Sequence, residues 1–173
     1  MAITVPNGTN TGETKVNWDD HEIILENRGE IISSALGIET LIDDIISSLF
    51  FDQHSDSKLF KEIFLSQEGV SLHTKERALS RLLEAKRIYD GDGDRKQLIS
   101  KIASIKETRN RFAHGNICFD KSGAYLEYYK NGLTTQRLDD SYWKEVESSF
   151  NTTSQLLSEL FRKILNSKKN NVT

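Results

Sequence analysis

The sequence predicts an all-α fold, a helical bundle that carries one small β-hairpin. Long segments near both ends of the chain repeat apolar residues at alternating spacings of three and four, which is the pattern of amphipathic helices. Shorter segments between them show the same periodicity and predict shorter helices. An Asn-Gly pair, Asn131-Gly132, separates two runs of β-prone residues, and this arrangement predicts a hairpin.

The first long helix is expected to begin near Asp19 or Asp20 and to run to about Phe50. Its apolar seam consists of Ile24, Ile31, Ala35, Ile38, Ile42, Ile45 and Leu49. Two charged residues, Arg28 and Glu39, fall inside the arc of this seam, where a simple bundle would have aliphatic side chains. Glu39 either meets a buried arginine there or lies at the edge of the seam and reaches water.

Two shorter helices are expected next, one after Asp56-Ser57 and one from residue 72 or 74 to residue 88 or 89. The run Asp90-Gly91-Asp92-Gly93-Asp94 resembles the start of a calcium-binding loop. However, Arg95 stands where that loop needs glycine, and Lys101 stands where it needs glutamate. The run therefore predicts a capping turn, after which a helix starts at about Arg95.

That helix is expected to end at His114. The hairpin follows at about residues 124–138, and a last long helix from Ser141 to about Ser167 closes the core. The chain thus reads as one helical domain over residues 17–168, with a flexible arm at 1–16 and a short tail at 169–173.

Composition predicts a cytoplasmic protein. Hydrophobic residues make up 36% of the chain and charged residues 28%. A single cysteine, Cys118, allows no internal disulfide and fits a reducing compartment. The N-terminal residues lack the features of a signal peptide, and no apolar run is long enough to span a membrane.

Charge is distributed unevenly along the chain. The net charge is −3, yet residues 73–114 contain eleven Lys and Arg against six Asp and Glu, a local balance of +5. A basic segment of this kind favours a polyanionic ligand such as RNA, although solvated lysines on amphipathic helices produce the same count.

Arg109 occupies an unusual place in the helix that ends at His114. It lies near the middle of an apolar arc formed by Leu98, Ile102, Ile105, Phe112 and Ala113. A guanidinium on a packed face needs an anionic partner, either a carboxylate or a phosphate. Glu39 is the first candidate for the carboxylate, for Arg109 or for Arg28.

His114 could act as a general acid or base at neutral pH. It shares a helix face with Asn110, but it lies five residues after Arg109, about 140° around an ideal helix. Two arrangements could bring the two side chains together. A frayed or left-handed last turn at Gly115 could swing the imidazole toward the arginine, or a second copy of the helix could supply the partner across a two-fold axis.

A purely structural interpretation also fits these residues. His114 would complement the helix dipole, and Arg109 would form a salt bridge in the core. The remaining histidines are scattered and have no metal-ligand spacing, so the sequence predicts neither a metal nor another cofactor.

The stretch Arg109-Asn110-Arg111-Phe112-Ala113-His114 resembles the R-x(4–6)-H motif of the HEPN superfamily, an all-helical fold found in toxins and in antiphage ribonucleases. The resemblance implies a homodimer in which two motifs meet and cleave RNA without a metal. Arg109 would bind the scissile phosphate, His114 would transfer a proton, and Asn110 would orient one of them. The basic residues Lys101, Lys106 and Arg111 would then track the RNA backbone.

A weaker likeness covers most of the chain. Residues 26–29, residues 31–46 with Glu39, and residues 105–114 are similar to the mannitol-repressor-like branch of HEPN-type proteins. That branch implies a non-catalytic regulator or interaction protein that acts as a dimer, such as the partner of an antitoxin. An endoribonuclease is therefore the leading hypothesis, and a regulator is the alternative.

Overall fold

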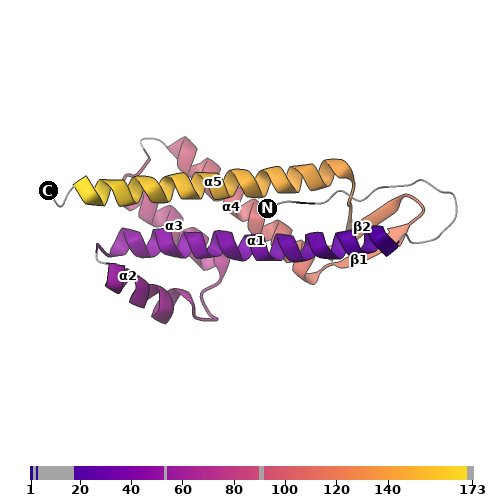
Figure 1. Ribbon diagram of the computed structural model, residues 1–173, viewed down its shortest axis with the longest axis horizontal. Coiled ribbons are helices and arrows are strands. Elements are labelled where there is room, and N and C mark those ends of the chain that lie inside the picture. The colour runs from indigo at the N-terminus through magenta and orange to yellow at the C-terminus, as the bar shows by residue number, and fades with distance from the viewer. Residues whose placement is uncertain (2, 4–17, 53, 90–91, 171–173) are drawn as a thin grey trace. The chain divides into compact units, whose positions relative to one another are not determined.

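The computed structural model describes residues 1, 3, 18–52, 54–89 and 92–170, and Figure 1 labels the helices α1 to α5 and the strands β1 and β2. The elements in order are α1 (Trp18–Phe50), α2 (His54–Phe60), the π-helical turn η1 (Lys61–Leu65), α3 (Leu72–Ala85), α4 (Asp92–His114), β1 (Asn116–Asp120), β2 (Gly123–Tyr129), β3 (Leu133–Arg137) and α5 (Asp140–Asn170). The protein is thus predominantly helical, as predicted. The expected arm at 1–16 lies outside the described residues, apart from Met1 and Ile3.

The chain divides into two compact units. Unit 1 comprises Met1–Ala35 and Glu107–Asn151, and unit 2 comprises Leu36–Lys106 and Thr152–Thr173. The boundaries fall inside α1, α4 and α5, so each of these helices contributes to both units. The sequence predicted a single domain because 173 residues is an ordinary length for one domain.

Unit 1 contains a small sheet and the helix segments around it. The sheet is antiparallel in the order β1-β2-β3, and Leu126 at its centre is completely buried. Buried aromatic side chains from α4 and α5 form much of the remaining core, namely Phe112, Trp143 and Phe150. Successive residues of β2 point to opposite faces of the sheet, so Leu126 can face the core while its neighbours along the strand face the other side.

Unit 2 consists of helical segments. Its buried aliphatic side chains are Ile38, Ile42, Ile45, Ile46, Leu49, Leu65, Leu79, Leu83, Leu98, Ile102, Ile105, Leu157, Leu160 and Ile164. The members on α1 continue the seam that the sequence predicted. Their spacing of three and four residues places them on one face of the helix, and burial of that face supplies the hydrophobic driving force.

The predicted hairpin is present, but the sequence analysis missed one strand. The hairpin is formed by β2 and β3, and its connection contains Asn131 and Gly132 with φ of 56° and 135°. These left-handed angles explain the Asn-Gly pair. Strand β1 starts immediately after Gly115 and pairs with β2 from Asn116 opposite Glu127 to Asp120 opposite Gly123.

Several helix boundaries also differ from the prediction. Helix α2 begins at His54, before Asp56-Ser57, and α5 continues to Asn170, so the first two residues of the expected tail are helical. Helix α4 begins at Asp92 instead of Arg95, while Asp90 and Gly91 of the predicted capping turn lie outside the described residues. Helix α3 ends at Ala85 because Arg87 adopts a left-handed φ of 51°, and the Ile88 amide donates to the Leu83 carbonyl at 3.1 Å. Glycine usually occupies such a position, so an arginine there gave no signal in the sequence.

Candidate functional site

The R-x(4–6)-H residues lie in unit 1, at the C-terminal end of α4. Arg109 is half-buried, whereas Asn110 and His114 are exposed. Phe112, between them in sequence, is completely buried and contacts the Trp143 ring with a centroid distance of 5.7 Å. The packing of Phe112 therefore fixes this end of the helix while the polar side chains beside it face solvent.

Arg109 has a neutral partner. Its Nη1 donates to Oδ1 of Asn110 at 3.0 Å. None of the ion pairs between described residues involves Arg109, so the expected carboxylate partner is not found there. Since an amide oxygen leaves the positive charge uncompensated, the guanidinium keeps its ability to bind an anion.

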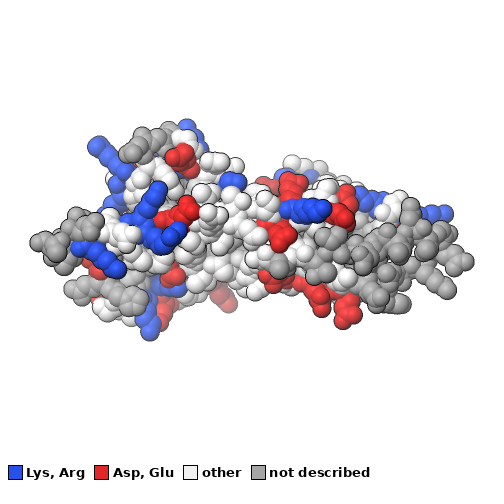
Figure 2. Space-filling model, turned by 45° about the horizontal axis from the view of Figure 1, so that its top comes forward, with Lys and Arg blue, Asp and Glu red and all other residues white. Residues whose placement is uncertain are grey.

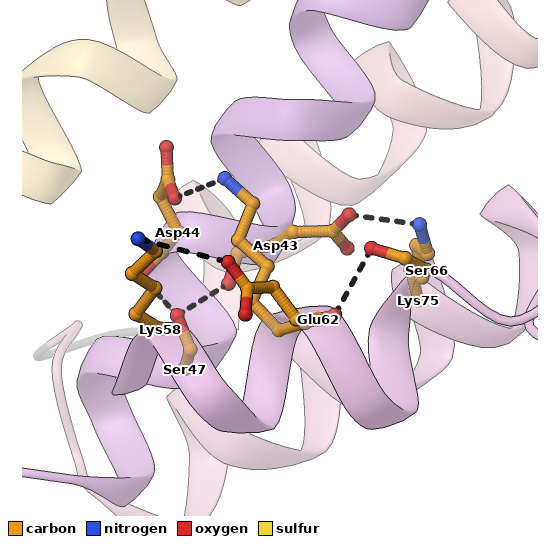
Figure 3. Close-up of polar contacts among 8 residues, drawn as sticks. Asp43, Asp44, Ser47, Lys58, Glu62, Ser66 and Lys75 are labelled. Atoms are coloured by element: carbon orange, nitrogen blue, oxygen red, sulfur yellow. Dashed lines mark hydrogen bonds and ion pairs between the residues drawn. The ribbon is translucent and has the colours of Figure 1, made fainter. Parts of the chain in front are cut away.

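Glu39 has a different partner from the one we expected. Its carboxylate accepts from Nζ of Lys75 at 2.7 Å. Lys75 also donates to Asp43 at 2.9 Å, the contact drawn in Figure 3. Lys75 is only 4% exposed. Glu39 therefore belongs to a buried charge cluster within unit 2, and its predicted pairing with Arg109 or Arg28 is wrong.

The two buried members of this cluster both have raised pKa values. Burial raises the pKa of Asp43, since desolvation of its carboxylate outweighs the charge of Lys75. Burial by itself would lower the pKa of Lys75, but the hydrogen bonds from its ammonium to Glu39 and Asp43, together with the charges of these carboxylates, raise it. One ammonium group thus serves two carboxylates, and Lys75 stays protonated.

Arg28 caps the helix that carries the candidate site. Its Nη2 donates to the carbonyl oxygen of Ala113 at 3.2 Å. That carbonyl belongs to the last turn of α4, where helical hydrogen bonding leaves oxygens without partners and the helix dipole favours a cation. Arg28, although it lies in the seam of α1, therefore has a hydrogen-bond partner in the last turn of α4.

Gly115 is required by close packing. A Cβ at this position would lie 2.5 Å from the Arg111 carbonyl oxygen and 2.9 Å from the Glu127 carbonyl oxygen. Gly123 and Gly132 have a positive φ, but Gly115 does not. The Gly115 amide donates to the Arg111 carbonyl at 2.7 Å, as it would if the helix continued. A left-handed turn at Gly115, one of the arrangements that could have brought His114 to Arg109, is therefore not formed.

A second group of charged residues joins the hairpin to α4. Glu107 accepts from Arg111 and from Lys130, each at 3.1 Å, and Lys130 lies at the hairpin connection. The Arg111 guanidinium also lies over the Tyr128 ring, 5.1 Å from its centroid. Hydrogen bonding from Lys130, followed by the charges of Lys130 and Arg111, holds the pKa of Glu107 below its usual value.

The sequence analysis selected Arg111 but missed Glu107, Tyr128 and Lys130. The spacing of Glu107 and Arg111 could have indicated their pairing, since residues four apart share a helix face. Lys130 gave no such signal because it meets Glu107 from 23 residues away in the sequence. The structure thus places the hairpin beside the candidate site.

The other two predicted RNA-binding residues, Lys101 and Lys106, belong to unit 2. Lys106 donates to Glu76 and lies 3.2 Å from Nδ1 of His73, so its charge is already compensated. On the face drawn in Figure 2, basic side chains (blue) and acidic side chains (red) lie close to one another. The predicted basic segment is therefore partly neutralised by its own carboxylates.

Nothing among residues 18–52, 54–89 and 92–170 gathers three or more His, Cys, Asp or Glu side chains around a possible metal ion. Within the same part of the chain, no helix combines the length and apolar character needed to cross a membrane. Comparison of the chain with protein-family models, with curated proteins and with solved structures found no match.

Proposed function

We propose that this protein is a metal-independent endoribonuclease of the HEPN type. The observation that carries the proposal is the state of Arg109, a guanidinium at the solvent-facing end of α4 that is held by the neutral amide of Asn110. Within the described residues it has no carboxylate to displace. An incoming phosphate would therefore gain a charge-assisted hydrogen bond without first breaking an ion pair.

The reaction would use the RNA itself as the nucleophile. The ribose 2′-oxygen attacks the adjacent phosphorus, the bond from phosphorus to the 5′-oxygen breaks, and the products are a 2′,3′-cyclic phosphate and a 5′-hydroxyl. One base takes the 2′-hydroxyl proton and one acid protonates the leaving 5′-oxygen. His114 performs one of these transfers, and Arg109 stabilises the negative charge that grows on the phosphate.

A second copy of the chain would complete the site. Because Gly115 has no left-handed turn, His114 remains about 140° around the helix from Arg109 in the ideal geometry. The other arrangement that the sequence left open is a two-fold axis that brings a second α4 end into the site. We therefore include a homodimer with paired sites in the proposal.

The test is cleavage of a mixed RNA pool in EDTA, with end-group analysis of the products. We expect wild type to cleave and to leave cyclic-phosphate ends, while Arg109→Ala and His114→Ala each lose about 100-fold or more in rate. Arg77→Ala and His73→Ala are matched controls, since both residues are exposed and belong to unit 2. Intact RNA after incubation with wild type at low salt would contradict the proposal.

The alternative is a non-catalytic regulator or an interaction protein held by an antitoxin-like partner. It is favoured by the large exposed apolar side chains of unit 2, such as Phe50 and Phe64, which are 57% and 58% exposed. Expression separates the two functions. An active ribonuclease toxin slows growth when induced alone and loses this effect in His114→Ala, whereas a regulator gives equal growth with both forms.

A further inference from the structure

Two cations from different elements of unit 1 meet a single carboxylate oxygen. Arg111 of α4 and Lys130 at the hairpin connection each donate to the same atom, Oε2 of Glu107, at 3.1 Å. We call Glu107, Arg111 and Lys130 together the hairpin clamp. The side chains of Glu107 and Lys130 are 51% and 55% exposed, so an anion can reach both of them from solvent.

The hairpin clamp keeps one positive charge. Hydrogen bonding from Lys130 holds the pKa of Glu107 below its usual value, so Glu107 is ionised at neutral pH and contributes one negative charge. Arg111 and Lys130 contribute two positive charges. One carboxylate therefore serves two cations, and one further negative charge would balance the group. A phosphate of a nucleic-acid backbone carries a single negative charge.

The ring of Tyr128 orients the arginine of the clamp. The Arg111 guanidinium lies 5.1 Å from the centroid of this ring, in a cation–π contact. A guanidinium presents five N–H donors in a planar fork, and Glu107 accepts from its Nη2 nitrogen. Because the packing against Tyr128 already restricts this side chain, it loses little freedom when it binds the oxygens of a phosphate.

The hairpin clamp lies on the side of α4 that carries His114. Glu107 and His114 are seven residues apart, which places them within about 20° of each other around an ideal helix. Arg111 and His114 are three residues apart, with Cβ atoms roughly 5–6 Å from each other. Arg109 lies about 160° from both Glu107 and Arg111. An anion at the clamp is therefore beside His114 and separate from an anion at Arg109.

We propose that the hairpin clamp binds a phosphate of the RNA strand next to the one that is cut. RNA as the ligand rests on the proposed function, since the clamp by itself specifies only a phosphate-like anion. Lys130 makes the β2–β3 hairpin an RNA-binding element. Glu107 opposes binding, because its carboxylate competes with the phosphate for the same two cations. Two residues in direct contact thus have opposite effects on the affinity for RNA.

The experiment is a titration of a short fluorescent single-stranded RNA, followed by anisotropy at salt concentrations from about 50 to 200 mM. Its riboses are 2′-O-methylated, so the 2′-oxygen cannot attack and binding is measured without cleavage. Lys130→Gln should weaken binding by roughly fivefold at about 0.1 M salt and reduce the slope of log affinity against log salt by about 0.7, the contribution of one phosphate contact. Glu107→Gln should tighten binding by roughly threefold to fivefold and steepen this slope.

Two matched controls make the same changes of net charge elsewhere in unit 1. Lys121→Gln removes an exposed lysine at the opposite end of β2 from Lys130, about 20 Å along the strand and beyond the screening length of about 10 Å at 0.1 M salt. Glu22→Gln removes an exposed glutamate of α1. Both should change the affinity by less than about twofold. All four substituted residues are exposed, so the buried core stays intact.

Failure of the hairpin clamp and failure of the ribonuclease proposal give different results. If RNA binding depends on Arg109 while Lys130→Gln and Glu107→Gln behave like the controls, the clamp is overturned and the ribonuclease proposal stands. Weaker binding by Glu107→Gln would also overturn the clamp, because the carboxylate would then support the two cations instead of competing for them. If both expected effects appear while wild type leaves cleavable RNA intact, the clamp is upheld and the ribonuclease proposal is wrong.

Discussion

At Gly115 the end of α4 passes so close to β2 that no side chain fits. The nearest atoms to an added Cβ would be two backbone oxygens and the Leu126 Cδ1, the last at 2.9 Å. Backbone atoms cannot rotate away as a flexible side chain does. The residue after the motif is therefore constrained by its tertiary surroundings and not by its own φ.

We expect Gly115→Ala to lower the free energy of unfolding by about 1–3 kcal/mol, because the strand or the helix end must shift to admit the methyl group. Gly37→Ala is the matched control. Gly37 lies inside α1 with nothing within 4 Å of an added Cβ, so alanine there should raise stability by about 0.5–1 kcal/mol. Urea unfolding measures both, and an equal effect of the two substitutions would contradict the close contact.

Tyr142 is a second residue defined by its surroundings. It is 9% exposed, and within the described residues its hydroxyl has no hydrogen-bond partner. Burial raises its pKa from 10.0 to about 12. The unfolded chain therefore ionises first as pH rises, and the native state loses stability between about pH 10 and pH 12, by on the order of 2–3 kcal/mol in full.

We expect Tyr142→Phe to remove this alkaline loss and to leave stability at pH 7 unchanged or raised by about 1 kcal/mol, because an unsatisfied hydroxyl disappears. Tyr129→Phe is the control, since Tyr129 is 85% exposed. Stability is measured by urea unfolding at several pH values from 8 to 11. If the stability of wild type and of Tyr142→Phe changed with pH in parallel, the Tyr142 hydroxyl would ionise alike in the folded and the unfolded chain, and the prediction would be wrong.

At the scale of elements, the long helices could be predicted from periodicity, and their charge partners could not. The seam of α1 is visible in the sequence, yet Glu39 pairs with Lys75 of α3, 36 residues away. Lys75 lies in a helix that was expected to be merely amphipathic. A buried lysine leaves no pattern in the sequence, because lysine is the common residue of exposed helix faces.

Lys75 should be essential to the contact between α3 and α1. We expect Lys75→Met to lower stability by about 3–5 kcal/mol at pH 7, since it leaves two carboxylates without their cation. Lys61→Met, which breaks the half-exposed pair with Asp44, should cost about 1 kcal/mol or less. Urea unfolding at pH 7 compares the two variants.

The pH dependence gives an independent check on the same variant. Asp43 has a raised pKa in the folded state, and loss of Lys75 raises it further. A carboxyl group of this kind binds a proton more readily in the folded than in the unfolded chain, so stability rises as pH falls toward its folded pKa. The deficit of Lys75→Met should therefore shrink between pH 7 and pH 5, and a deficit that stays constant would contradict a buried carboxylate.

At the scale of the whole molecule, charge is organised by pairing and not by sequence density. The segment 73–114 has a local balance of +5, but Lys75, Lys106 and Arg111 all have carboxylate partners. Only charges that remain uncompensated strengthen binding to a polyanion through release of counterions. The charge of Arg109 is uncompensated because its partner, Asn110, is neutral, whereas the charge of Lys106 is compensated by Glu76.

We expect RNA binding by the protein to weaken with salt and to depend on Arg109 more than on Lys106. For single-stranded RNA, Arg109→Gln should reduce the slope of log affinity against log salt by about 0.7, the contribution of one phosphate contact. Lys106→Gln should leave the slope unchanged because Glu76 already neutralises this lysine. Equal reductions in both variants would show that the pairing in unit 2 opens when RNA binds.

The sequence by itself determined the helical class, the approximate bounds of α1 and α5, the hairpin at Asn131-Gly132 and the end of α4 at His114. These features depend on periodicity and turn chemistry, which are properties of neighbouring residues. Tertiary structure alone decided the pairing of Glu39, the neutral partner of Arg109, the strand β1 and the contact between Lys130 and Glu107. Each depends on which side chains meet and which stay free once the chain has folded, and local sequence patterns carry little of that information.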